Sequence, residues 1–187
     1  PNPYRFLDFT RKEDLPVVLA HPLFFKTGKN EPSLRIVEKL CLLFDCFEAV
    51  NGQRSSWQNL LISAYLENLT PEAVEEMGRR TGLSPAEFTR QPYKKRFTGG
   101  SDDHMGIFAG LSGTLVHAPG VGEAPPSRRI LEGLRNGTLA PYGFHNETSN
   151  MAVAFLDYFC QGVIKLKDPG LMRMLLHKGS RRDKLFA

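Results

Sequence analysis

Short apolar runs alternate with amphipathic segments along the chain, and polar turn residues separate them. The first apolar run, residues 15–20, stops at His21 and is typical of a buried strand in a parallel sheet. A helix is expected at 33–43, and residues 44–50 predict a second strand that closes at Asn51. A strand, a helix and a strand in this order form a βαβ unit.

The rest of the chain continues this pattern, whereas residues 1–13 show no clear period. Thr70 and Pro71 carry the signature of a helix start, and Gly137 that of a helix end. Further helices are expected at 57–69, 71–82, 127–136, 148–164 and 171–177, with a short helical turn at 83–87, and further strands are expected at 97–101 and 113–116. The fold class is therefore α/β, with function expected at the carboxyl ends of strands.

Three of the expected strands carry polar residues at their ends, where an apolar strand needs none: His21, Glu48 with Asn51, and the sequence Asp102-Asp103-His104. On an extended segment, residues i and i+2 point to the same side, so Asp102 and His104 are expected to share a metal ion. A carboxylate with an imidazole suits Zn, Mn or Fe. The alternative is an ordinary turn after the strand, in which Asp103 caps the next segment of the chain.

The other candidate residues each allow more than one interpretation. His21 is either a metal ligand or a structural hydrogen-bond donor, and Pro22 is expected to hold it in an extended conformation. Glu48 is a metal ligand, a carboxylate that orients an imidazole, or a surface acid. Asn51 is first of all a turn signal. Arg54 is close enough in sequence to contact an anion at the same strand end, or it is solvated.

Composition narrows the classes of protein further. With 41% hydrophobic and 24% charged residues, the chain is typical of a globular protein, and no apolar run is long enough for a transmembrane helix. Cys41, Cys46 and Cys160 are odd in number and lie in apolar stretches, which favours a reducing, cytoplasmic compartment over a disulfide framework. A net charge of +4 tolerates an anionic ligand, but the basic residues are scattered, so nucleic-acid binding is not indicated.

Three motifs in this order resemble the PHP (polymerase and histidinol phosphatase) superfamily. They are the strand ending in His-Pro at 17–22, the strand with Glu-x-x-Asn at 44–52, and Gly-Ser-Asp-x-His within 98–104. The segment 131–137 also resembles a helix of that family. The likeness covers about residues 14–140, with a helical region at 141–187, and it is greatest to the PHP-type domain found with bacterial glycosyltransferases.

The resemblance implies the C-terminal portion of a distorted (β/α)7 barrel with two or three divalent metal ions (Mn, Zn or Fe). Such a site hydrolyses phosphate esters of small molecules with metal-activated water. By resemblance, His21, Asp102 and His104 are metal ligands and catalytic residues. Glu48 and Asn51 match positions beside the site. We count Glu48 among the candidate metal ligands, and Asn51 with Arg54 among the candidate substrate-binding residues.

The chain departs from the family pattern because it contains no His-x-His strand and only part of the ligand set. It also begins with Pro1 and not with Met. We therefore expect residues 1–187 to be a single PHP-like domain that lacks its N-terminal half. A half barrel exposes strand edges and needs that half or a partner. The competing explanation is a degenerate, non-catalytic accessory domain of, or partner to, a glycosyltransferase.

Overall fold

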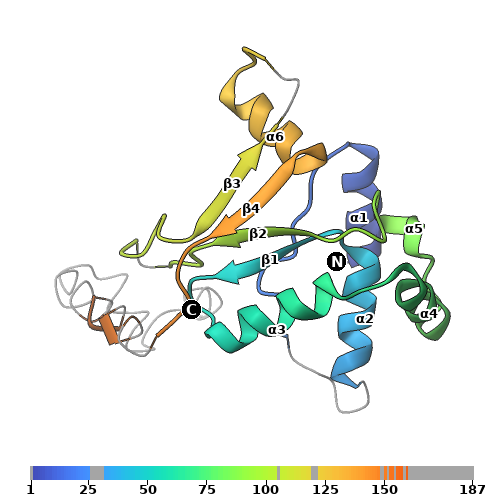
Figure 1. The fold of residues 1–187 in the computed structure, drawn as a ribbon, viewed down its shortest axis with the longest axis horizontal. Coiled ribbons are helices and arrows are strands. Elements are labelled where there is room, and N and C mark those ends of the chain that lie inside the picture. Colours follow the sequence, from blue (N-terminus) through green and yellow to red (C-terminus); the bar gives the residue numbers. More distant parts are fainter. Residues whose placement is uncertain are drawn as a thin grey trace, which may run out of the picture. The chain divides into compact units, whose positions relative to one another are not determined.

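The computed structural model describes residues 2–25, 32–104, 106–118, 122–147, 150, 152, 153, 155–157 and 159. It divides into two units, the first comprising Pro1–Asp103 with Phe108–Asn146, and the second His104–Ile107 with Glu147–Ala187. The named elements lie in the first unit (Figure 1): α1 (Pro3–Lys12), α2 (Ser33–Leu43), β1 (Cys46–Asn51), α3 (Ser56–Glu67), α4 (Pro71–Thr81), α5 (Pro85–Phe88), β2 (Arg96–Gly100), β3 (Gly113–His117), α6 (Pro126–Asn136) and β4 (Thr138–Tyr142).

Two parallel strands, β1 and β2, form the centre of the first unit, in a register from Cys46 with Arg96 to Asn51 with Gly100. Leu19 extends this ladder on the other edge of β1, where its N–H donates to the Cys46 oxygen (3.0 Å) and its oxygen accepts from Glu48 N–H (2.9 Å). The parallel βαβ order is therefore confirmed.

The buried strand predicted at residues 15–20 is wrong in extent. The segment forms one bridge, at Leu19, and the side chains of Leu15 and Val18 are exposed. Pro16 has no N–H to donate to a ladder, and the backbone turns at His21, which has a φ of 31°. Only Leu19, near the end of the segment, pairs with β1.

A second, antiparallel ladder joins β3 to β4. The strand β3 is predicted, but β4 is not, because Pro141 lies within it and an internal proline argues against a strand. The two ladders are linked through Gly99, whose N–H donates to Thr114 Oγ1 and whose oxygen accepts from it, both at 2.9 Å. The described strands thus confirm a mixed α/β fold, and no closed barrel is seen among them.

The helices α2 to α6 follow the expected positions. In α4, the Thr70 side chain accepts from Ala73 N–H, and Gly82 ends the helix in the left-handed conformation. The helix α1 is not predicted, although the Asn2 side chain caps it and Pro3 follows at its first turn. Most of the predicted helix at 148–164 and all of that at 171–177 lie outside the described residues.

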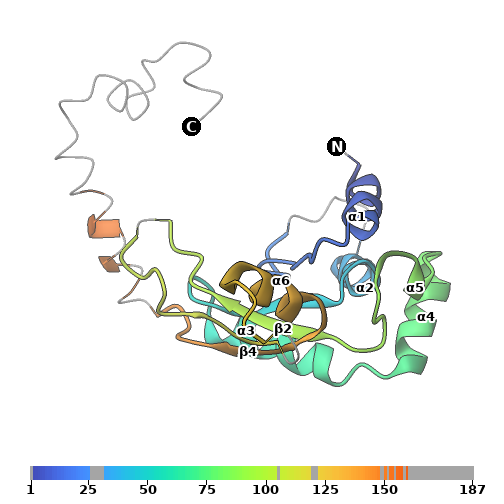
Figure 2. The ribbon, with the colours of Figure 1, turned by 90° about the horizontal axis from the view of Figure 1, so that it is seen from above.

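The core lies between α2, α3, α4 and β1. Its buried residues are Cys41, Leu42, Phe47, Ile62, Leu66, Val74 and Met77. Two views place α1 and α5 at the amino ends of β1 and β2 (Figure 1 and Figure 2). The carboxyl ends of the two strands are directed away from these helices, and polar residues gather there.

Candidate functional site

Two polar residues that follow neighbouring strands meet at the carboxyl ends of β1 and β2. Arg54 follows β1 and Asp102 follows β2, and Arg54 Nη2 lies 3.6 Å from Asp102 Oδ2. The exposed fractions of the two side chains are 24% and 16%. Because parallel strands end at the same edge of a sheet, this proximity follows from the pairing of β1 with β2. Arg54 is therefore a largely buried residue of this edge and not a solvated one.

Glu48 holds the turn at His21 in place. Its Oε2 accepts from the main-chain N–H of His21 (2.8 Å) and from Asn51 Nδ2 (2.7 Å). A Cβ atom at Gly100 would lie 2.5 Å from Glu48 Oε1, so the glycine makes room for this carboxylate. Of the three roles considered for Glu48, the surface acid is excluded, and the carboxylate orients the backbone of His21 and not its ring.

The conformation of His21 differs from the prediction. We expected Pro22 to keep His21 extended, but its φ of 31° is in the left-handed region. Its N–H is bound by Glu48, and its oxygen accepts from Phe24 N–H at 2.8 Å. These two hydrogen bonds fix a turn that outweighs the local preference for an extended backbone.

Phe24 lies between His21 and Arg54. Its ring meets the imidazole of His21 edge to face, with centroids 5.6 Å apart. The Arg54 guanidinium carbon lies 3.8 Å from the centre of the same ring, in cation–π geometry. Arg54 Nε is buried and has no hydrogen-bond partner among the described residues. The ring and Asp102 together therefore fix the direction of the guanidinium.

A buried asparagine pair supports the same strand end. Asn59 Oδ1 accepts from Asn51 N–H (3.3 Å), and Asn59 Nδ2 donates to Asn51 O (3.0 Å). Asn59 Nδ2 also lies 2.8 Å from His145 Nδ1. An amide nitrogen only donates, so Nδ1 of His145 is the acceptor and its proton is on Nε2. Asn51 is 1% exposed, and its amide binds Glu48 within this network.

Sequence patterns did not predict the roles of Phe24, Asn59 or His145. The sequence contains one indication of the role of Asn59, because it is a polar residue on the buried side of α3. His145 and Phe24 reach the site only through tertiary contacts, which no spacing along the chain encodes.

Asp102 and His104 do not lie on one extended segment as predicted. Asp102 has a φ of 50°, so the alternation of side chains in a strand does not apply to it. Asp103 Oδ2 accepts from Phe108 N–H at 2.7 Å and caps the following turn, as the alternative interpretation expects. His104 belongs to the second unit, whereas the other candidate residues belong to the first.

The predicted ligands include the donor types that Zn, Mn and Fe prefer. In the part of the chain that the structure describes, however, no three His, Cys, Asp or Glu side chains form a group that suits a metal ion. Glu48 already accepts two hydrogen bonds and Asp102 faces Arg54. The described residues therefore do not make a complete metal site by themselves.

Comparisons of the chain with protein-family models, curated proteins and solved structures found no match. Among the described helices, none has both the length and the apolar character needed to cross a bilayer.

Proposed function

We propose that the chain is part of a metal-dependent hydrolase of the PHP type that acts on phosphate esters of small molecules. The observation that carries the proposal is the pairing of Arg54 with Asp102 at the carboxyl ends of parallel strands, next to the Glu48–His21 turn. In open α/β sheets this edge is where ligands bind. In the proposal, β1 and β2 belong to a larger distorted (β/α)7 barrel.

The described residues have binding and orienting roles in this proposal. The Arg54 guanidinium is planar and held against Phe24, and such a group binds phosphoryl oxygens through two parallel N–H donors. Glu48 positions the turn that carries His21. Metal-activated water requires ligands in addition to those the described residues bring together, so we assign no step to a metal ion here.

The second candidate is a non-catalytic accessory domain of, or partner to, a glycosyltransferase. It is favoured by the engagement of both carboxylates within the protein, Glu48 with two hydrogen-bond donors and Asp102 with Arg54. In such a domain these contacts stabilise the strand ends and bind no substrate.

Metal analysis combined with hydrolysis of p-nitrophenyl phosphate in the presence of Mn²⁺ separates the two candidates. For the hydrolase, the full-length protein that contains this chain retains Mn, Zn or Fe, and His21→Ala or Asp102→Asn lowers its kcat/KM by about 100-fold, as expected for residues at a metal site. The matched controls are His117→Ala and Asp8→Asn, which alter exposed residues away from the site. A full-length protein without metal and without hydrolysis supports the accessory domain.

A further inference from the structure

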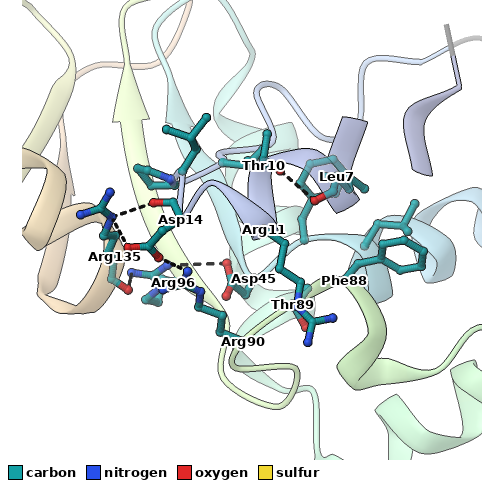
Figure 3. Close-up of a pocket in the computed structure, with 15 residues that line it drawn as sticks. Leu7, Thr10, Arg11, Asp14, Asp45, Phe88, Thr89, Arg90, Arg96 and Arg135 are labelled. Atoms are coloured by element: carbon teal, nitrogen blue, oxygen red, sulfur yellow. Dashed lines mark hydrogen bonds and ion pairs between the residues drawn. The ribbon is translucent and has the colours of Figure 1, made fainter. Parts of the chain in front are cut away.

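A cavity of about 60 Å³ lies at the amino ends of β1 and β2, at the other end of these strands from the candidate site (Figure 3). Its wall includes Asp45, directly before β1, and Arg96, the first residue of β2. The helix α1 and the segment around α5 contribute other parts of the wall. All of these elements belong to the first unit.

Positive charge exceeds negative charge in this wall. The charged residues that line the cavity are Arg11, Arg90, Arg96, Arg135, Asp14 and Asp45. The two carboxylates are shared: Asp14 pairs with both Arg90 and Arg135, and Asp45 lies 3.5 Å from Arg96. Within the described residues, Arg11 pairs with no carboxylate. Its Nη1 donates instead to the main-chain oxygens of Ala86 and Glu87.

One donor in this wall is buried without an acceptor among the described residues. The side chain of Arg96 is 12% exposed, and its Nε forms no hydrogen bond with any described residue. The guanidinium is held from its other side, where Nη1 donates to Leu134 O (2.6 Å) and Arg135 O (3.0 Å). A buried guanidinium N–H without an acceptor is costly, and an anion in the cavity would supply that acceptor.

The size of the cavity limits what it can hold. One water molecule needs roughly 10–15 Å³ of such space, so the cavity has room for only a few waters. It is far below the roughly 300–1,000 Å³ of sites for drug-sized ligands. From the excess of arginines, the unpartnered donor and this size, we propose that the cavity binds a free tetrahedral oxyanion of the size of inorganic phosphate.

The anion would also stabilise the packing of the N-terminal helix α1 against the rest of the first unit. Asp14 follows α1 with a φ of 56°, and both its carboxylate and its main-chain oxygen bind Arg135. Arg11 lies on α1 itself and Arg135 on α6. An anion between these arginines offsets their mutual repulsion, so phosphate binding is expected to stabilise the docking of α1.

Calorimetric titration of the full chain with inorganic phosphate tests the proposal, in EDTA and with NaCl keeping the ionic strength constant. Saturable binding with a rise in Tm is expected. Arg11→Gln and Arg90→Gln should each weaken the affinity about tenfold, since each removes a charge-assisted hydrogen bond. The matched control, Lys12→Gln, removes the same charge from an exposed residue of α1 and should keep the affinity.

Further variants distinguish this site from the candidate active site. His21→Ala and Asp102→Asn should leave phosphate affinity unchanged, whatever the outcome of the hydrolysis experiment. If they abolish phosphate binding while Arg11→Gln does not, the proposal is overturned. Should the arginine variants fail to fold, the Nε–H resonance of Arg96 in the unaltered chain is the readout. It should shift on saturation with phosphate, and a resonance that stays in place contradicts the proposal.

Discussion

The guanidinium of Arg54 faces the carboxylate of Asp102 across the ends of two parallel strands, with 3.6 Å between the nearest nitrogen and oxygen. Both side chains are largely buried, so solvent screens this pair less than it screens an ion pair on the surface. The pair depends on the register of β1 with β2, and any change that shifts the ladder is expected to separate the two groups.

Arg54→Lys tests whether the shape of the guanidinium matters in addition to its charge. Lysine keeps the charge but loses the planar contact with Phe24 and the forked donors. The free energy of unfolding should fall by about 1 kcal/mol, measured by urea denaturation. The matched control is Arg79→Lys, whose side chain is 72% exposed and pairs within α4, and it should change stability by less than about 0.5 kcal/mol. Equal losses would contradict the role assigned to Phe24.

Gly99 and Gly100 should respond differently to alanine. A Cβ at Gly99 would lie 2.5 Å from the main-chain oxygen of Gly113, whereas a Cβ at Gly100 would meet the end of the Glu48 side chain and no main-chain atom. Gly99→Ala should therefore lower the free energy of unfolding by about 2–3 kcal/mol, and Gly100→Ala by less than about 1 kcal/mol. Urea denaturation of both variants measures the difference, and a reversed order would show that β2 and β3 are not in close contact.

Lys95 caps a helix from far along the sequence. The last turn of α2 has no basic residue of its own, and Lys95 Nζ donates to Cys41 O (2.5 Å) and Phe44 O (3.1 Å) there. Lys95→Met keeps the apolar stem but removes these donors, and it should cost about 1–3 kcal/mol of unfolding free energy. Lys94→Met, at the exposed neighbouring position, should cost less than about 0.5 kcal/mol. The two melting temperatures provide the comparison.

The buried thiols should be unreactive in the folded chain. Burial raises the pKa of Cys41 to about 12 and that of Cys46 to about 11, so neither forms a thiolate near neutral pH. In a Cys160→Ser variant, a thiol reagent at pH 8 should label neither residue until urea unfolds the chain. Fast labelling under native conditions would show that α2 and β1 open readily.

The same pKa values predict a loss of stability at alkaline pH. Unfolded thiols titrate near 9.0, while the folded thiols stay protonated up to their raised pKa values. Above about pH 9 the unfolded state binds fewer protons than the folded state, so the free energy of unfolding falls as pH rises. The loss at pH 10 is about 1 kcal/mol per thiol. Cys41→Ala should make the slope between pH 8 and 10 shallower, whatever its effect at pH 7.

Local signals in the sequence predicted much of the fold. The cap at Thr70 and the glycine at 82 place α4 almost to the residue, because those signals act within one helical turn. The strand β4 was not predicted because its proline contradicts the local pattern, and its pairing with β3 is a tertiary contact that the local sequence does not encode. The helix α1 was missed although Asn2 and Pro3 mark its start.

The candidate site was predictable only where chain order determines it. Adjacent parallel strands bring Arg54 and Asp102 to one edge, and the sequence order of the strands implies this. The turn at His21 depends on a carboxylate from β1, and this bond overrides the local effect of Pro22. The contribution of Asn59 likewise depends on how α3 packs against β1, which residue spacing does not encode.

The two hydrogen bonds between Gly99 and Thr114 make the Gly99 amide proton a measure of the contact between the two ladders. One threonine hydroxyl satisfies both main-chain groups of Gly99, where a further strand would otherwise pair with β2. The exchange of the Gly99 amide proton with solvent is therefore controlled by whether the β3–β4 hairpin stays attached to the parallel pair. Transient release of the hairpin would leave this amide open to solvent while the β1–β2 ladder remains intact, so its protection measures the cohesion of the two ladders.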